Sequence, residues 1–170
     1  MNFYELAQER YSARKYKSAK VEEEKINLIL EAGRIAPTAT NAQPQRIYVL
    51  TGDEALKKIN EITPYAFHAP LVMLVCADIS KAWKNPFNGR NSAEMDASIV
   101  TTHMMLQAKE LGIDSVWVCY FDTEKVKKKF NLPENIEPYC LMPMGYAADD
   151  ATPSPRHSQR KPLDETVTFI

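Results

Sequence analysis

Residues 71–77 form an uninterrupted apolar run, Leu-Val-Met-Leu-Val-Cys-Ala, near the middle of the chain. A strand that is hydrophobic throughout, rather than at alternate positions, has to be covered on both faces of its sheet. The run is too short to cross a bilayer as a helix, which takes about 20 residues. The chain is therefore predicted to fold around a buried strand with a layer of structure on each side.

Helical and extended patterns surround this strand. Helices are predicted at residues 2–10, 21–36, 53–62, 94–111 and 122–131, and strands at 47–51, 71–77, 115–120 and 139–144. The helix at 94–111 is apolar on most of its sides, which is typical of a core or interface helix. Since two helices precede the first strand, an α+β layered domain fits this order better than a regular doubly wound sheet.

Size and charge limit the partners. With 45% apolar and 25% charged residues, residues 1–170 are expected to form one globular domain. Lys and Arg number 21 against 22 Asp and Glu, so neither nucleic acid nor a membrane is expected as a partner. A body of this size leaves little room for a large ligand wholly inside it. A partner subunit is therefore expected to complete any large pocket.

Several common functional patterns are absent from the sequence. The five glycines are too far apart to form Rossmann, Walker or nucleophile-elbow loops. Cys76, Cys119 and Cys140 lie in apolar stretches without CxxC spacing, which predicts core thiols and a reducing, cytoplasmic location. No signal-peptide pattern is expected at the start, and no zinc motif includes the histidines. His103, within the apolar helix, is interpreted as a core histidine.

Cationic side chains gather near both ends of the chain. Arg10, Ser12 and Arg14 follow the first helix, and the tail carries a second group, Arg156, Arg160 and Lys161. In extended backbone, alternate residues point to one side, so the first group would present two guanidinium forks and a hydroxyl to a phosphate. A solvated basic surface, balanced by acidic residues 22–24, explains the same pattern, and composition alone favours it.

Two further segments carry candidate ligand contacts. One is a polar loop whose amide and hydroxyl groups would suit the edge of a heteroaromatic ring. An ordinary connection between a helix and a strand explains its composition equally well. The loop contains Pro37, Thr38, Thr40, Asn41, Gln43 and Pro44. Residues 142–145 end an apolar strand with a thioether and backbone N–H groups, or simply pack in the core. Trp83 and Phe87 lie in a loop predicted at 80–92, where they would stack on a substrate or pack on their own domain.

Taken in order, these segments resemble the nitroreductase family of FMN-dependent oxidoreductases over essentially the whole chain. Residues 10–16, Arg-Tyr-Ser-Ala-Arg-Lys-Tyr, are similar to the family's Arg-x-Ser-x-Arg/Lys-x-aromatic signature. Residues 36–44 are similar to its Pro-Ser/Thr-x-x-Asn-x-Gln-Pro loop. Residues 144–146, Met-Gly-Tyr, resemble its late Gly-aromatic element, and residues 160–163 resemble its C-terminal basic segment.

The resemblance implies a three-layer α+β fold with a central mixed sheet of about four strands flanked by helices. It also implies a homodimer with two FMN sites at the subunit interface, in which the tail of each chain embraces the other. Residues 166–170 are strand-prone, so a C-terminal strand exchanged with the partner is expected, although a frayed terminus is the ordinary alternative. The implied cofactor-binding residues are Arg10, Tyr11, Ser12, Arg14, Pro37, Thr38, Ala39, Asn41, Gln43, Met144, Gly145, Arg160 and Lys161.

The resemblance also implies a role for each group. Arg10, Ser12 and the pair at 160–161 hold the phosphate, and Arg14 faces the pyrimidine side of the isoalloxazine ring. The loop at 37–39 approaches from the partner subunit, with ring-edge or loop-ordering amides at positions 41 and 43. Residues 144–145 offer backbone to the flavin N5 region. At 62–65, where larger relatives carry an Asn and a Lys toward the flavin, this chain reads Ile-Thr-Pro-Tyr.

The implied activity is electron transfer from NADH or NADPH, through FMN, to a small nitroaromatic or quinone acceptor in a ping-pong cycle. Because the flavin supplies the difficult chemistry, no catalytic side-chain nucleophile or acid–base pair is needed. Two alternatives share the fold. One is a flavoenzyme acting on a specific metabolite or on flavin itself, and the other is a flavin-binding protein without turnover.

Overall fold

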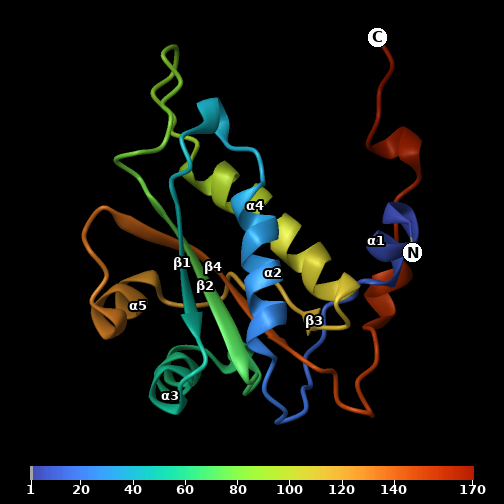
Figure 1. Ribbon diagram of the computed structural model, residues 1–170. Coiled ribbons are helices and arrows are strands. Elements are labelled where there is room, and N and C mark those ends of the chain that lie inside the picture. The colour runs from blue at the N-terminus through green and yellow to red at the C-terminus, as the bar shows by residue number, and fades with distance from the viewer. Residues whose placement is uncertain (1) are drawn as a thin grey trace.

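The computed structural model describes residues 2–170 and contains five α-helices around one four-stranded sheet (Figure 1). The helices are α1 (Phe3–Glu9), α2 (Glu23–Arg34), α3 (Asp53–Ile62), α4 (Ala93–Glu110) and α5 (Thr123–Phe130). The strands are β1 (Gln45–Leu50), β2 (Leu71–Asp78), β3 (Asp114–Ser115) and β4 (Ile136–Gly145). Short 3₁₀ turns occur at η1 (Ala39–Asn41), η2 (Pro64–Ala66), η3 (Pro155–Ser158) and η4 (Leu163–Glu165).

The sheet has the strand order β1-β2-β4-β3, and all three strand pairings are antiparallel. The predicted number of strands is therefore confirmed, but the ladders are antiparallel where a mixed sheet was expected. Parallel pairing occurs at an isolated bridge between Ser12 and Ser115. The N-terminal segment thus pairs with the edge strand through this bridge without adding a parallel strand to the sheet.

β2 is covered on both faces, as its sequence predicts. Leu71, Met73 and Val75 pack into one core with α2 and α4. Val72, Leu74 and Cys76 alternate with them and pack into a second core with α3 and α5. Since successive strand residues point to opposite faces, each face of the sheet has its own helical layer, and the three-layer α+β fold is confirmed.

α2 and α4 cross closely within the first helical layer. A Cβ atom at Gly33 would lie 2.8 Å from the Met104 Cγ and 3.3 Å from the Val100 Cγ1, so only glycine fits this crossing without repacking. α4 buries residues along its length, which confirms it as a core helix. His103 is an exception, because it is exposed on a side of α4 that a single chain leaves uncovered. The interpretation of His103 as a core histidine is therefore wrong.

β3 is much shorter than the strand predicted at 115–120. Val116 and Val118 still donate backbone hydrogen bonds to β4, from the Val116 N to the Pro143 O at 3.1 Å and from the Val118 N to the Leu141 O at 2.9 Å. Pro143 has no N–H to return, so a regular ladder cannot form. The chain beyond leaves the sheet, and Cys119 is exposed, contrary to the prediction of three core thiols.

The C-terminal tail runs beside α1 and away from the body of the molecule (Figure 1). Residues 166–170 form no strand within one chain, and the Phe169 side chain is 96% exposed.

The loop predicted at 80–92 is also found. It is closed by a backbone hydrogen bond from the Asn85 N to the Arg90 O at 2.8 Å, and Phe87 at its tip does not pack on its own domain. Within residues 2–170, no helix combines the length and hydrophobicity needed to span a membrane.

Candidate functional site

The segment after α1 is fixed along the edge of the sheet. The Ala13 N donates to the Ser115 O at 3.1 Å, and the Tyr16 hydroxyl shares its proton between the carbonyl oxygens of Ala13 and Pro143, at 2.8 and 3.1 Å. The Ala13 side chain is fully buried. Residues 12 and 14 on either side of it are therefore turned away from the core, as the alternation of extended backbone requires.

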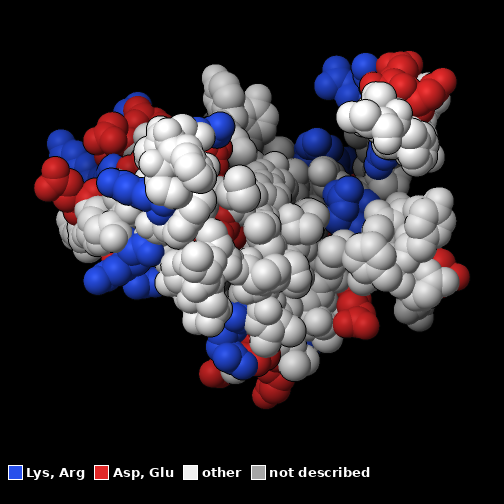
Figure 2. Space-filling model, turned by 90° about the horizontal axis from the view of Figure 1, so that it is seen from above, with Lys and Arg blue, Asp and Glu red and all other residues white. Residues whose placement is uncertain are grey.

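Those side chains meet the C-terminal tail at a cavity of about 280 Å³, which we call the cationic cavity. It is lined by Arg10, Ser12, Arg14, Ser154, Arg156, His157 and Arg160. Figure 2 shows Lys and Arg side chains in the hollow between the projecting tail and the body. The structure therefore brings cations from the two ends of the chain together, as the family resemblance implies.

The charges of the cationic cavity are not neutralised by carboxylates. Within residues 2–170, none of its four arginines forms an ion pair. Burial and then the nearby charge of Arg160 lower the pKa of Arg10 from its usual value, although an arginine stays charged at neutral pH. Gathered like charges are costly unless an anion joins them, so the cavity suits a phosphate group.

Backbone carbonyls orient two of these guanidinium groups. The Arg14 Nη1 donates to the Ser12 O at 3.1 Å. The Arg160 Nη1 donates to the carbonyl oxygens of His157 and Gln159 at 2.6 and 2.8 Å. Each group keeps further N–H donors for a ligand, because a guanidinium carries five.

Two residues predicted for this site lie differently. Lys161 does not line the cavity and pairs with Glu165, with 3.1 Å between its Nζ and the carboxylate Oε2. Tyr11 also lies outside the lining, with its ring packed edge-on against His157 at 6.4 Å and the Lys109 Nζ 5.6 Å from its centroid. It joins the N-terminal segment to the tail.

The tail also contributes Ser154 and His157, which are not predicted from the sequence, and Arg156, which belongs to the predicted cationic group but not to the implied cofactor contacts. Ser154 caps the η3 turn by accepting a hydrogen bond from the Arg156 N at 3.3 Å, and Ser154, Arg156 and His157 all line the cavity. A serine followed by a proline is a recognisable start signal for such a turn. This signal predicts the turn that places Arg156 at the cavity.

A second cavity, of about 230 Å³, shares Arg14 with the cationic cavity, and we call it the ring cavity. Its other lining residues are largely apolar or aromatic: Tyr65, Phe67, Val116, Trp117, Val118, Cys119 and Tyr120. Arg14 therefore lies between a site for an anion and a site for a flat apolar group. This is the arrangement that a ring system carrying a phosphate requires.

The polar loop at 37–43 lines neither cavity in a single chain. It is anchored by Asp96, which is buried, accepts from the Ala39 N at 2.8 Å and accepts from the Ser92 hydroxyl at 2.7 Å. Its positive φ values fix an unusual backbone shape; they are 52° at Thr40, 57° at Asn41 and 49° at Gln43. Pro37, Thr38, Ala39, Asn41 and Gln43 can therefore contribute to these cavities only from a second subunit.

Met144 and Gly145 are buried at the end of β4. The Met144 side chain is fully inside the first core, so its thioether packs against the core in a single chain. A Cβ atom at Gly145 would lie 2.9 Å from the Pro70 Cγ, which explains the glycine by close packing. Neither residue lines the cationic or the ring cavity in one chain.

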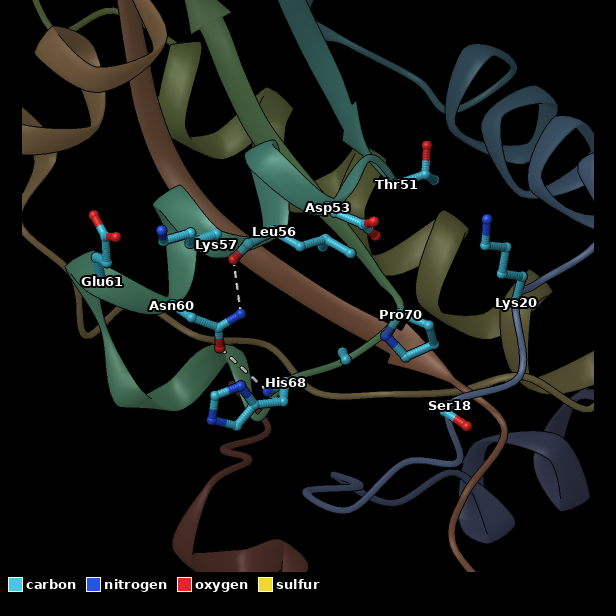
Figure 3. Close-up of a pocket in the computed structure, with 11 residues that line it drawn as sticks. Ser18, Lys20, Thr51, Asp53, Leu56, Lys57, Asn60, Glu61, His68 and Pro70 are labelled. Carbon is cyan, nitrogen blue, oxygen red and sulfur yellow. Dashed lines mark hydrogen bonds between the residues drawn. The ribbon is translucent and has the colours of Figure 1, made fainter.

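A larger cavity, of about 630 Å³, lies between α3, residues 18–20 and residues 68–70 (Figure 3). Its charges are mixed, because Lys20 and Lys57 share it with Asp53 and Glu61. It has no lining residue in common with the cationic cavity. It therefore lacks the uncompensated positive charge that marks the cationic cavity as an anion site.

Comparison with known proteins identifies the fold and the family. A solved nitroreductase family protein from Clostridium difficile 630 superposes with a TM-score of 0.94 at 46% identity, covering 99% of this chain and 98% of that one. An FMN-dependent nitroreductase from Clostridium difficile R20291 superposes with a TM-score of 0.78 at 26% identity, covering 96% of each chain.

Sequence comparison agrees. A protein from Methanothermobacter thermautotrophicus, named as an NADH dehydrogenase/NAD(P)H nitroreductase, is 32% identical over 157 residues, which is 88% of this chain and 80% of that protein. The family model described as Nitroreductase family matches residues 7–67 and 62–146. These matches confirm the resemblance carried by the N-terminal signature, the polar loop and the late Gly-aromatic element, and the chain belongs to the nitroreductase family.

Proposed function

We propose that the protein is an FMN-dependent NAD(P)H oxidoreductase that binds the flavin phosphate in the cationic cavity and the flavin ring in the ring cavity. The observation that carries this proposal is the cluster of four arginines, which form no ion pair within residues 2–170, beside an aromatic-walled cavity. Bound there, FMN would accept a hydride from NADH or NADPH and pass electrons to a nitroaromatic or quinone acceptor in a ping-pong cycle. The names of the FMN-dependent and NAD(P)H-using relatives support this function.

The residues divide the binding between them. Arg10, Arg156 and Arg160 offer charge-assisted hydrogen bonds to the phosphate oxygens, and Ser12 adds a hydroxyl. Arg14, at the junction of the two cavities, faces the ring's pyrimidine edge and stabilises the negative charge that the flavin gains on reduction. Lys161, held by Glu165, is at most a peripheral contributor.

The proposed active form is a homodimer. An apolar groove of about 630 Å³ lies between α1, α2 and α4, and Phe3 and Ile35 in its lining are 71% and 66% exposed. Exposed apolar side chains such as these lower the free energy of association when a second chain covers them. A second subunit would also bring its polar loop at 37–43 to the flavin, which the single chain does not do.

The absorbance spectrum of the purified protein tests this function. We expect a yellow protein whose flavin absorbance is bleached by NADH or NADPH and restored by a nitroaromatic or quinone acceptor. Bleaching without turnover of such acceptors would instead favour an enzyme for a specific metabolite or for flavin. A yellow protein that neither cofactor bleaches would be a flavin-binding protein without turnover. A colourless protein that takes up no added FMN would refute the proposal.

Removal of residues 166–170 is expected to weaken the dimer. Phe169 and Ile170 have no contact within one chain that buries them, and the tail leaves the body near α1 (Figure 1). In a partner's groove they would bury apolar surface, which is worth about 25 cal/mol per Å². Sedimentation velocity over a dilution series should show the truncated chain dissociating at a higher concentration than the full chain. Equal dissociation would show that the tail does not hold the dimer.

A further inference from the structure

Three aromatic side chains stand together in the ring cavity. The Tyr65 and Tyr120 rings pack edge to face, with centroids 5.1 Å apart and an interplanar angle of 84°, and Phe67 packs against Tyr65 at 5.8 Å and 67°. All three line the cavity. Tyr120 is nevertheless 73% exposed and Tyr65 42% exposed, so the pair is ordered while much of its apolar surface still faces solvent.

One buried side chain fixes this pair. Thr63 is 1% exposed, and its hydroxyl donates to the Tyr120 carbonyl oxygen at 2.6 Å while accepting from the Tyr65 N at 3.2 Å. The two tyrosines come from separate segments, the η2 turn and the chain after β3. A single hydroxyl therefore ties together two backbone segments that are distant in sequence. A buried hydroxyl is used in this way only where both hydrogen bonds are made, since an unsatisfied one is costly.

We propose that Tyr65 and Tyr120 form the wall against which the isoalloxazine ring packs, and that Thr63 is the positioning residue that holds this wall. The inference rests on the proposed function. Edge-to-face aromatic pairs leave ring surface available for a further flat group, and Arg14 in the same cavity supplies a donor for that group's carbonyl edge. The pair is in this way a determinant of ring binding that is separate from the phosphate contacts.

Riboflavin, which has the ring but no phosphate, isolates this contribution. Apoprotein would be titrated with FMN and with riboflavin, and binding measured by quenching of flavin fluorescence. Tyr120→Ala is expected to weaken both ligands by the same factor, about three- to tenfold. Tyr120→Phe keeps the ring and should bind both as the wild type does. Because Tyr120 is largely exposed, the alanine variant is expected to fold, which circular dichroism checks.

Thr63 is tested by a matched pair of variants. Thr63→Val keeps the shape but removes the hydroxyl, and we expect riboflavin and FMN to bind about threefold more weakly. Thr63→Ser keeps the hydroxyl and should restore wild-type binding of both ligands. Valine and serine variants with equal affinities would overturn the positioning role.

The outcomes separate this inference from the proposed function. Wild-type apoprotein that binds neither flavin refutes the proposed function itself. Wild-type protein that binds FMN, together with a Tyr120→Ala variant that binds FMN equally well, refutes the aromatic wall alone. A variant weakened for FMN but not for riboflavin would also refute it, because the change would then act through the phosphate.

Discussion

FMN binds at least about a hundredfold more weakly when Arg10 and Arg160 are both replaced by alanine, if the cationic cavity holds the phosphate. Each guanidinium is expected to supply a charge-assisted hydrogen bond worth about 1.5–3 kcal/mol, and every 1.4 kcal/mol is tenfold in affinity. Isothermal titration of apoprotein with FMN measures the change. Riboflavin affinity should stay near the wild-type value, because riboflavin lacks the group that these residues bind.

The same substitution should leave the empty protein as stable as the wild type or slightly more stable. Arg10 and Arg160 repel each other in the empty cavity, and this repulsion contributes to the lowered pKa of Arg10. Removing both charges relieves the repulsion, so thermal unfolding of the apoprotein should not move to lower temperature. A double variant that unfolds earlier and loses affinity for both flavins would point to a structural role instead.

Lys161 provides a matched control for this experiment. It is the next residue after Arg160, yet it pairs with Glu165 and does not line the cavity. Lys161→Ala removes a charge from the same stretch of tail and should change FMN affinity by less than about threefold, since exposed ion pairs are worth little. A loss for this variant equal to that of Arg160→Ala would reassign the phosphate contact to Lys161.

The layers of the fold could be predicted because local pattern and tertiary packing agree there. The continuous apolar run of β2 requires cover on both faces, and the all-round apolar α4 requires a place in the core. Both requirements follow from the need to bury apolar side chains, and the hydrophobic pattern of the sequence shows where these side chains are. The five helices and four strands follow from the same patterns, with differences mainly at their ends.

The cationic cavity could be predicted in part, for a different reason. Alternation in extended backbone determines that Arg10, Ser12 and Arg14 face one side, with Ala13 buried between them. That the tail would come to the same place follows from no periodicity in the sequence. It is implied by the family resemblance, which points to Arg160 and Lys161. Arg160 lines the cavity, whereas Lys161 pairs with Glu165 in the η4 turn.

The remaining errors arise where a tertiary contact overrides a local pattern. Residues 115–120 have the composition of a strand, but Pro143 in the neighbouring strand cannot complete the ladder, and Cys119 becomes exposed. The pairing of Tyr65 with Tyr120 is not predicted because the two residues are more than fifty positions apart and meet only in the folded chain, through ring packing and the Thr63 hydroxyl. No single-sequence pattern marks such a pair.

Replacing Arg14 with alanine is expected to lower the midpoint potential of bound FMN by about 30–60 mV and to slow its reduction by NAD(P)H. Reduction places negative charge on the pyrimidine side of the flavin. A hydrogen bond from a charged donor stabilises that charge by about 1.5–3 kcal/mol. For a two-electron reduction, about 1.4 kcal/mol corresponds to about 30 mV. Because Arg14 is exposed in a single subunit, water screens its interaction with the flavin. The change in midpoint potential should therefore lie toward the lower end of this range.

Arg156 distinguishes a redox role from a binding role. Arg156 lines only the cationic cavity, whereas Arg14 lines both cavities. At saturating FMN, Arg156→Ala should therefore keep the wild-type potential despite its weaker binding, while Arg14→Ala lowers the potential. Arg14→Lys keeps the charge but loses the planar fork, so its potential should fall between those of the wild type and Arg14→Ala. Spectroelectrochemical titration measures all three. Equal potentials for wild type and Arg14→Ala would place Arg14 among the phosphate contacts alone, because a guanidinium near the ring must favour the more negative form.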